Sequence, residues 1–504
     1  MTTASDRSGK CPSVASRKGF RPAPIGHADI RWEASPEFPR FLRQLPQARR
    51  LEITRTPTKL VEQYDLPGAS LFVKRYLHGV RRFRPCKYFL RRPRSRREWQ
   101  RADRLEALGV PVVPHLAHGE RWSWRGLEES LLVTEGLPGF TVVSSQMDTT
   151  AADLQRSLGA FVASMHTAGI THQDLHPSNL VYSQQTQELK LIDLDKISIG
   201  PALDLDARLE ALAILHSQLP MTDAFFATYG DEYRRHRAWI QAQAREVRKR
   251  YLAEEAARCL PPRHHSSFAI KVVAGIKWLT RQEYVDQALL NVLEQPDLVL
   301  GTRAAQLKVS RSSTVAHTNG LVIRRYRPHG LRARARNYLR RSRARRIFRA
   351  GYHLEIAGIP TAPMIAAGDQ RRFGLVVASY VVTRELAATP LDQWRGNGAD
   401  LASAIGALIA ATHEAGFSHR DLKASNILVS SGHTPYLIDM DGVRYLGTVS
   451  DRRAIADLTR LARGLQHFRP QVRIADQLRM LRAYCRGRRR TDIRWWFEQI
   501  RTGV

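Results

Sequence analysis

The sequence predicts an α+β protein with two tandem bilobal domains, each with a small sheet-bearing lobe followed by a larger helical lobe. Two observations indicate this fold class. A motif of about 25 residues with a fixed internal spacing occurs in both halves of the chain. The chain has 504 residues, more than one hydrophobic core usually serves, since domains commonly span ~150 residues. We expect a disordered segment over 1–19, a first domain over 20–262 and a second over 263–504.

Strands are expected at the start of the first domain. Residues 59–61 and 70–74 flank a Leu-Pro-Gly turn at 66–68, which is typical of a hairpin. No glycine-rich phosphate loop occurs in this stretch. Lys74 follows an apolar triplet, so its ammonium is expected at a strand end. It is either an ordinary snorkelling lysine or a functional cation.

A helix is predicted to follow and to end at Gly109 and Pro111. Glu98 lies in its first turn, where an acid either interacts favourably with the helix dipole or pairs with Lys74. We favour the pair. Residues 130–136 then read as a buried strand that runs into a loop, where a nucleotide base is expected to dock.

The repeated motif carries the residue types that phosphoryl transfer needs. Asp174, in a His-Gln-Asp triplet, is followed five residues later by Asn179, and Asp193 arrives 19 positions after Asp174. Phosphoryl transfer requires a carboxylate that orients the attacking hydroxyl and oxygen ligands that hold Mg²⁺. Asp174 suits the first task, and Asn179 with Asp193 suits the second. His172 is more often a scaffold that hydrogen-bonds its loop than a catalyst.

The second half repeats this order with Asp421, Asn426 and Asp439. Other segments also match across the halves: 71–76 with 321–326, 105–111 with 354–360, and 133–134 with 382–383. The offset between the copies drifts only from 250 to 246. We therefore interpret the chain as the tandem duplication of a whole domain.

These residues resemble the lipopolysaccharide core kinases of the Kdo/WaaP family, which have a protein-kinase-like fold. The resemblance covers 73–74, 97–99, 108–111, 133–135, 172–179 and 192–195, and in the second half 419–426 and 438–441. Asp-Leu-Asp and Asp-Met-Asp stand in place of Asp-Phe-Gly, which is more similar to this family than to eukaryotic protein kinases. Residues 172–179 are also similar to the aminoglycoside and choline phosphotransferases.

The resemblance implies ATP-dependent, Mg²⁺-dependent phosphorylation of a sugar, heptose or Kdo, of the lipopolysaccharide inner core. The expected site residues are, for catalysis, Asp174 and Asp421; for the nucleotide, Lys74, Glu98 and Arg324; and for the metal, Asn179, Asp193, Asn426 and Asp439. Two alternatives stay open. One is a nucleotide-binding pseudokinase scaffold for envelope biogenesis, and the other is a protein Ser/Thr kinase, suggested by 419–423 alone.

The two copies have diverged at two expected site positions. Arg324 replaces Lys74, and Ile347 replaces Glu98. An arginine cannot form the buried pair with an isoleucine, although its guanidinium can contact phosphates. The second copy is expected to bind Mg-nucleotide weakly, to act with altered geometry or to be a regulatory pseudokinase. The first copy is expected to be the main catalyst.

The formal net charge of +32 predicts an anionic partner. Basic runs at 81–97 and 324–349 occupy the same slot in both copies, with Phe83, Tyr88, Tyr338 and Phe348 interleaved. Such runs are usually solvated faces. Their duplicated placement favours lipopolysaccharide core, another anionic glycolipid or an anionic membrane surface. Nucleic acid is the less favoured partner, because no recognition fold such as an RRM or zinc finger is evident.

Cysteine usage and hydropathy indicate a cytoplasmic protein. A peripheral position on the cytoplasmic face of the inner membrane is compatible with the same features. The cysteines number four and are scattered singly, as expected of a reduced setting. The first 20 residues lack the apolar run of a secretion signal, and no apolar run of 18 residues occurs. The aromatic triplet 495–497 is expected either to anchor at an interface or, preferably, to cap the second core.

Overall fold

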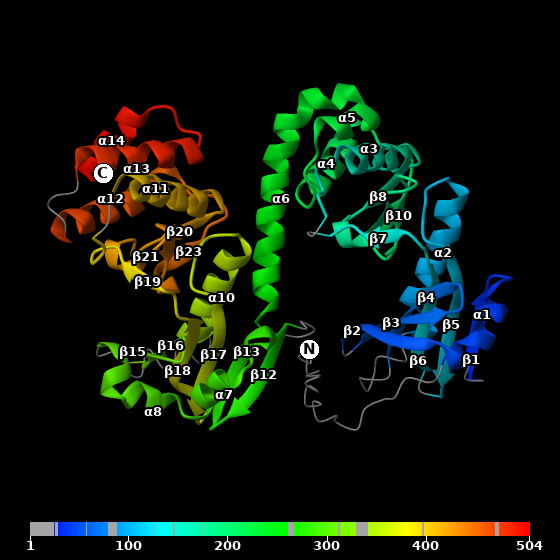
Figure 1. Ribbon diagram of the computed structural model, residues 1–504, viewed down its shortest axis with the longest axis horizontal. Coiled ribbons are helices and arrows are strands. Elements are labelled where there is room, and N and C mark those ends of the chain that lie inside the picture. Colours follow the sequence, from blue (N-terminus) through cyan, green and yellow to red (C-terminus); the bar gives the residue numbers. More distant parts are fainter. Residues whose placement is uncertain are drawn as a thin grey trace, which may run out of the picture. The chain divides into compact units, whose positions relative to one another are not determined.

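A computed structural model of the chain describes residues 25, 29–56, 58–78, 88–124, 126–144, 147–173, 175–260, 267–310, 313–328, 341–395, 398–468 and 473–503. The chain forms two compact units, Met1–Arg245 and Glu246–Val504 (Figure 1). The division lies within helix α6 (Arg237–Arg258). The domain boundary expected at 262/263 lies outside the described residues, as does the segment 1–19.

Unit 1 begins with a six-stranded antiparallel sheet in the order β1-β5-β6-β4-β3-β2. Its strands are β1 (Ile30–Ala34), β2 (Arg49–Arg55), β3 (Lys59–Leu66), β4 (Ala69–Leu77), β5 (His115–Ser123) and β6 (Gly126–Gly136). Helix α1 (Phe38–Gln44) and the 3-10 turn η1 (Leu45–Gln47) pack on one face, where Phe38 and Phe41 join Leu71 and Val73 in a buried cluster. Helix α2 (Arg94–Ala107) contacts β4, β5 and β6 (Figure 1).

The rest of unit 1 is mainly helical. Its helices are α3 (Ala152–Thr167), α4 (Leu205–His216), α5 (Asp223–Tyr229) and α6, with 3-10 turns η3 (Pro177–Asn179) and η4 (Asp231–His236). Short strands form two small sheets, β10-β9-β7 and β11-β8. These strands are β7 (Phe140–Val142), β8 (Ile170–His172), β9 (Leu180–Ser183), β10 (Leu189–Leu191) and β11 (Ile197–Ile199).

Unit 2 repeats this plan, beginning with a seven-stranded antiparallel sheet in the order β12-β13-β17-β18-β16-β15-β14. Its strands are β12 (Phe268–Val273), β13 (Ile276–Arg281), β14 (Gln306–Val309), β15 (Ser313–Thr318), β16 (Leu321–Tyr326), β17 (Met364–Arg372) and β18 (Leu375–Arg384). The connecting helices are η5 (Gln282–Tyr284), α7 (Gln287–Glu294), α8 (Pro296–Gly301), η6 (Arg303–Ala305) and α10 (Arg343–Ile356). Helices α7 and α8 contribute to the buried cluster on one face of the sheet, and α10 contacts β17 and β18.

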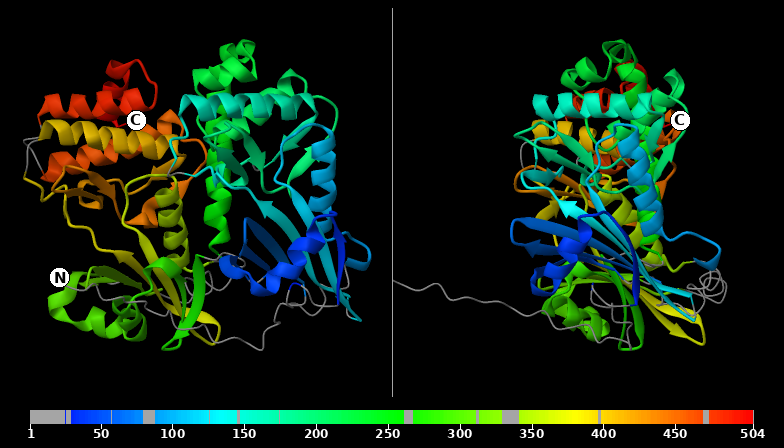
Figure 2. Two further views of the ribbon diagram at one scale, coloured as in Figure 1. Left: turned by 45° about the vertical axis from the view of Figure 1, so that its right-hand side comes forward. Right: turned by 90° about the vertical axis from the view of Figure 1, so that its right-hand side faces the viewer.

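The helical part of unit 2 places α11 alongside α13 (Figure 2). Its helices are α11 (Gly398–Glu414), α12 (Asp451–Phe468), α13 (Ile474–Gly487) and α14 (Ile493–Thr502), with 3-10 turns η7 (Ala424–Asn426) and η8 (Met440–Gly442). Short strands again form two small sheets, β19-β21-β22 and β20-β23. They are β19 (Ala388–Pro390), β20 (Phe417–His419), β21 (Ile427–Ser430), β22 (Pro435–Leu437) and β23 (Val443–Tyr445).

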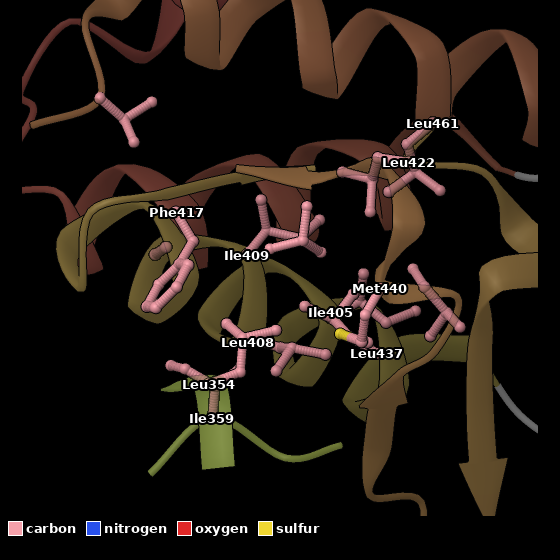
Figure 3. Close-up of a cluster of buried hydrophobic side chains, with 14 of the residues drawn as sticks. Leu354, Ile359, Ile405, Leu408, Ile409, Phe417, Leu422, Leu437, Met440 and Leu461 are labelled. Atoms are coloured by element: carbon pink, nitrogen blue, oxygen red, sulfur yellow. The ribbon is translucent and has the colours of Figure 1, made fainter. Parts of the chain in front are cut away.

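The core of the helical part of unit 2 joins residues from α10, α11 and the short strands (Figure 3). Ile405, Leu408 and Ile409 from α11 meet Leu354 from α10 and Leu437 from β22. Burial of a large aliphatic side chain contributes roughly 1.5–3 kcal/mol, so such a cluster holds these elements together.

One glycine in each unit allows a helix to turn directly into a strand. Gly169 follows α3 with φ +72°, and Gly416 follows α11 with φ +88°. A Cβ at Gly169 would lie 2.0 Å from the Gly200 carbonyl oxygen, and one at Gly416 would lie 2.5 Å from the Gly447 carbonyl oxygen. Only glycine fits both the left-handed conformation and the close approach.

The structure confirms the predicted fold class, because each unit has a sheet-bearing part followed by a helical part. Within the described ranges, no helix is both long enough and apolar enough to cross a bilayer.

Candidate active site

Lys74 and Glu98 form an ion pair in unit 1. Lys74 lies on β4 and Glu98 on the first turns of α2, and Lys74 Nζ is 3.2 Å from Glu98 Oε2. Successive strand residues point to opposite faces, so Lys74 points away from the face of Leu71 and Val73 that α1 covers. The pair is largely buried, because the Lys74 side chain is 12% exposed and the Glu98 side chain is 0% exposed.

Tyr76 holds the other oxygen of this carboxylate. It lies two residues after Lys74 on β4, and therefore on the same sheet face. Its hydroxyl donates to Glu98 Oε1 at 2.5 Å. Burial, together with Glu98, raises the pKa of Tyr76, so the phenol stays protonated and keeps this donor role. Tyr76 thereby leaves Glu98 Oε2 for the lysine.

Lys74 also contacts the segment that carries Asp193. Its Nζ donates to the Ile192 carbonyl at 2.7 Å. Burial lowers the pKa of Lys74, but Glu98 and Asp193 offset this and raise it overall. Burial raises the pKa of Asp193, while Lys74 and Lys59 lower it more strongly, so the net pKa of Asp193 is lowered. Both groups are therefore charged at neutral pH.

Backbone hydrogen bonds bring Asn179 next to Asp193 in unit 1. The Ile192 amide donates to the Asn179 carbonyl at 3.0 Å, which joins the end of η3 to the residue before Asp193. His172 Nε2 donates to the Asp193 carbonyl at 2.9 Å. His172 thus bonds the loop backbone, as its sequence position suggested. Asp174 lies outside the described residues.

Unit 2 uses its corresponding residues differently. Arg324, on β16, donates from Nη1 to Asp439 Oδ1 at 2.7 Å and from Nη2 to Asp439 Oδ2 at 3.3 Å. Ile347, on α10, is buried in the hydrophobic core at the Glu98 position and offers no carboxylate. Arg324 therefore pairs in bidentate fashion with the residue that matches Asp193.

The loop around Asp421 in unit 2 is closely bonded. Asn426 Nδ2 donates to the Asp421 carbonyl at 2.8 Å and to Asp421 Oδ2 at 3.1 Å, and Lys423 Nζ lies 2.8 Å from Asp421 Oδ2. Burial raises the pKa of Asp421, but Lys423 and Asn426 lower it more, so the carboxylate is ionised. Buried Asp457, on α12, accepts from the Ser418 hydroxyl at 2.6 Å and from the His419 amide at 3.1 Å. It thereby anchors the strand that leads into this loop.

Asp457 has no carboxylate counterpart in unit 1. The starts of α12 and α4 can be matched through their capping side chains. The Ser450 hydroxyl accepts from the Arg453 amide at the start of α12, and Asp457 lies seven residues after Ser450. Asp204 caps α4 of unit 1, and the residue seven positions after it is Ala211. At the sheet, unit 1 thus has a lysine–glutamate ion pair and unit 2 has an arginine–aspartate ion pair.

Part of each predicted basic run forms internal contacts. Arg94 and Arg97 each lie 3.6 Å from Asp195, and Arg343 lies 2.8 Å from Asp441 at the corresponding place. These arginines therefore hold the Asp-x-Asp segment against α2 or α10. Residues 79–87 and 329–340, with Phe83 and Tyr338, lie outside the described residues.

The prediction that Phe348 contributes to an anion-binding surface is wrong. Phe348 is 0% exposed and lies in the core of unit 2, because it is on the side of α10 that packs inward. Tyr88 instead packs its ring 4.3 Å from the ring of His78. In the C-terminal triplet, Trp496 is buried in the same core and Trp495 is 42% exposed, so this helix caps the core as expected.

The oxygen-bearing side chains of unit 1 fit a magnesium ion. Mg²⁺ is commonly held by one or two protein oxygens together with waters and substrate phosphates. Asn179 and Asp193 carry such oxygens on adjacent backbone, and no ion pair joins Asp193 to a cation within the described ranges. In unit 2, both Asp439 oxygens are bonded to Arg324, so this arrangement does not fit the metal. The described part of the chain contains no group of three or more His, Cys, Asp and Glu side chains that could together hold a metal ion.

Sequence reasoning missed Tyr76, Asp457 and the Arg343–Asp441 pair as elements of the site. Tyr76 could have been predicted to lie near Lys74, because a residue two positions after a strand lysine shares its sheet face. Asp457 lies 36 residues beyond Asp421, and the sequence gives no spacing rule that links them. Arg343 was one of many arginines in a run, so its specific partner could not be identified.

Comparison with known proteins shows which family the chain belongs to. The family model described as "Lipopolysaccharide kinase (Kdo/WaaP) family" matches residues 46–264 and 305–484, more than half of the chain in two copies. A structure of WaaP in complex with acyl carrier protein is 21% identical, with a TM-score of 0.32, and covers 43% of this chain and 99% of that one. Spectinomycin phosphotransferase APH(9)-Ia, in complex with ADP and spectinomycin, is 10% identical, with a TM-score of 0.30, and covers 43% of this chain and 84% of its own. A search of curated proteins gives no match. On the family match, the chain is a phosphotransferase and belongs to the lipopolysaccharide kinase (Kdo/WaaP) family in tandem duplication.

Proposed function

We propose that unit 1 transfers the γ-phosphoryl group of ATP to a hydroxyl of heptose or Kdo in the lipopolysaccharide inner core. The observation that carries this proposal is the Lys74–Glu98 pair, with Lys74 also bonded to the Ile192 carbonyl beside Asp193. A cation beside an oxygen-bearing side chain is the arrangement that binding of a metal nucleotide requires. Membership of the lipopolysaccharide kinase family supports the choice of acceptor.

Each proposed role follows from the chemistry of the side chain. Lys74 binds the α- and β-phosphates, and Glu98 fixes the direction of its ammonium. Asp174 orients the acceptor hydroxyl and accepts its proton. Asn179 and Asp193 hold Mg²⁺, which neutralises charge on the phosphates when it is bound. Because transfer requires little covalent chemistry by the protein, positioning and charge account for most of the catalysis.

Unit 2 is proposed to be a pseudokinase. The specific observation is the bidentate pair between Arg324 and Asp439, which occupies both oxygens of the expected metal ligand. We thus propose that Arg324 prevents Asp439 from binding a metal, and that Arg324 is not a phosphate ligand. Asp421 and Asn426 bond to each other, which stabilises their loop without any need for a substrate.

We further propose that the enzyme works at an anionic surface on the cytoplasmic face of the inner membrane. The net charge of +32 supports this, since each basic residue near an anionic leaflet contributes about 1 kcal/mol. Lipopolysaccharide core and acidic phospholipid are both anionic, and the acceptor of a core kinase is anchored in that membrane. Binding to vesicles with and without anionic lipid, measured by co-sedimentation over a salt series, tests this part.

Phosphate transfer to purified lipopolysaccharide core tests the main proposal. Labelled Mg-ATP is supplied to the full chain, to Asp174→Ala and to its matched counterpart Asp421→Ala. We expect the glycan to be labelled by wild type and by Asp421→Ala, and the Asp174→Ala rate to fall by several orders of magnitude. Near-normal transfer by Asp174→Ala would remove unit 1 from the mechanism. Label on added protein but not on the glycan would favour a protein kinase, and no label despite Mg-ATP binding would favour the scaffold.

A further inference from the structure

Lys59 lies on the sheet face that carries the proposed nucleotide site. It is the first residue of β3, and the strand register pairs it directly with Tyr76 on β4. Directly paired residues on neighbouring antiparallel strands have side chains on the same face of the sheet. Tyr76 and Lys74 share that face, because they are two residues apart on β4. Lys59 therefore lies on the face of Lys74 and not on the face that α1 covers.

A continuous set of contacts joins Lys59 to the Lys74–Glu98 pair. Lys59 Nζ lies 5.9 Å from the centroid of the Tyr76 ring, within the range of a cation–π contact. The Tyr76 hydroxyl bonds one oxygen of Glu98, and Lys74 bonds the other. Both oxygens of Glu98 are thereby in use, and neither is bonded to Lys59.

Lys59 lies near charged groups of both signs. Among the residues that the structure describes, Lys59 forms no ion pair, although its side chain is partly buried. Burial and then the like charge of Lys74 lower the pKa of Lys59, while Asp193 and Glu98 raise it in part. A multiply charged anion is attracted to two ammonium groups that share one sheet face.

Local hydrogen bonds fix the backbone from which Lys59 projects. The Thr56 hydroxyl accepts from the Lys59 amide at 3.0 Å and donates to the Lys59 carbonyl at 3.1 Å. The Thr56 amide also donates to that carbonyl at 2.7 Å. The connection between β2 and β3 reads Thr-Pro-Thr and contains no glycine. A cradle of backbone amides of the kind formed by a glycine-rich loop is therefore not expected there.

Unit 2 has a different residue at this register position. Ser313 on β15 pairs with Tyr326 on β16, as Lys59 pairs with Tyr76. The Ser313 hydroxyl is bonded within its own turn, to the Ser310 hydroxyl at 3.1 Å. The lysine is thus absent from the unit whose expected metal ligand is bonded to Arg324.

We propose that Lys59 is a second phosphate-binding residue of unit 1, which contacts the polyphosphate of the nucleotide in place of a glycine-rich loop. This inference rests on the proposed function of unit 1. The ammonium of Lys59 approaches the phosphates from the start of β3, and Lys74 approaches them from the middle of β4. Because no described carboxylate forms an ion pair with Lys59, its contribution is expected to depend on the number of phosphates in the ligand.

Equilibrium binding of Mg-ATP, Mg-ADP and adenosine to the full chain tests this inference. The variants are Lys59→Met, which keeps an apolar stem, Lys59→Arg, which keeps the charge, and Lys74→Ala, which identifies binding to unit 1. Lys277→Ala serves as the matched control, since it removes an exposed lysine from a strand of the unit 2 sheet. We expect Lys59→Met to bind ATP about 10- to 100-fold more weakly and adenosine unchanged. Lys59→Arg should recover most of the affinity, and the control should bind as wild type.

The outcomes separate the inference from the function on which it rests. Loss of ATP affinity in Lys74→Ala but not in Lys59→Met would overturn the role of Lys59 and leave the function of unit 1 intact. No change in either variant would overturn both. Equal losses for ATP and adenosine in Lys59→Met would show a packing role instead. If Lys59→Met does not fold, as judged by its thermal transition, Lys59→Arg provides the test. An ATP affinity of Lys59→Arg as low as that of Lys74→Ala, with an unchanged ratio of ATP to adenosine affinity, would also reject the inference.

Discussion

Units 1 and 2 each place a cation at the corresponding point of their sheets and give it different partners. In unit 1, Lys74 pairs with Glu98 and leaves Asp193 free of ion pairs among the described residues. In unit 2, Ile347 removes the acid, and Arg324 pairs with Asp439 instead. A buried cation needs a nearby carboxylate. In unit 2, where the helix has no carboxylate at this position, the cation therefore pairs with the expected metal ligand.

The hydrogen bonds around this cation differ for the same reason. The Tyr76 hydroxyl bonds Glu98, whereas Tyr326 at the matching position presents its ring to Arg324, whose guanidinium carbon lies 5.2 Å from the ring centroid. Arg343 lies 4.4 Å from the same centroid. A guanidinium can stack on a ring and bond a carboxylate at once, which a compact ammonium does less well. Arginine at position 324 is therefore suited to a site in which the cation bonds a protein carboxylate instead of a ligand.

The largest expected effect is the loss of the metal ligand in unit 1. Asp193→Asn should lower kcat/KM for phosphate transfer about 10³-fold, because the charge that holds the metal is removed. The matched Asp439→Asn should change it less than about threefold. Steady-state kinetics of both variants with lipopolysaccharide core check this. Equal losses in the two variants would show that both units contribute to catalysis.

Installing the unit 2 residue in unit 1 should be the next most severe change. Glu98→Ile leaves Lys74 buried without its acid, so we expect transfer to fall about 10²-fold and the free energy of unfolding to fall by about 3 kcal/mol. Chemical denaturation and transfer assays measure the two effects. Glu98→Gln, which keeps the shape and the Tyr76 contact, should be less destabilising. Full activity in Glu98→Ile would show that Lys74 does not need this acid.

A difference in acid stability should also distinguish the units. His115 at the start of β5 is buried next to Lys74, and at the matching register unit 2 has Met364. Burial, and then the charge of Lys74, lowers the pKa of His115 from 6.5 to about 4. Between these pH values the unfolded chain binds a proton that the folded chain does not. The stability contribution is therefore full above pH 6.5 and is lost as the pH falls toward 4.

The variant His115→Met tests that difference. Its free energy of unfolding should fall less than that of wild type between pH 6.5 and 4, by on the order of 3 kcal/mol. Denaturant midpoints measured at several pH values within this window check the sign. Parallel curves for the two proteins would mean that folding does not shift the pKa of His115.

The smallest expected effect is a partial return of nucleotide binding to unit 2. Arg324→Lys combined with Ile347→Glu recreates the Lys74–Glu98 pair below Tyr326 and releases Asp439. In a Lys74→Ala background, Mg-ATP affinity should rise about tenfold. Ile347→Glu alone is the control and should destabilise the chain, because it adds a buried acid without a lysine partner. No gain in the double variant would place the defect of unit 2 elsewhere, for example at Ser313.

Much of the fold was predictable from the sequence because the same pattern occurs twice. Lys74 on a strand and Glu98 on a helix both lie in the predicted kinds of element. The ion pair between Lys74 and Glu98 could be suggested because both residues occur with the downstream motif. Phe348 was misassigned, because an aromatic in a basic run looks exposed until the inward face of its helix is known.

The sequence by itself determined the duplication, the two-part units and the residues that differ between copies, since these follow from spacing and residue type. Only the tertiary structure decided which charges pair. Arg324 and Asp439 are 115 positions apart, and Lys59 meets Tyr76 only through strand register. Ion pairs depend on distances of a few ångströms between distant segments, and folding sets these distances.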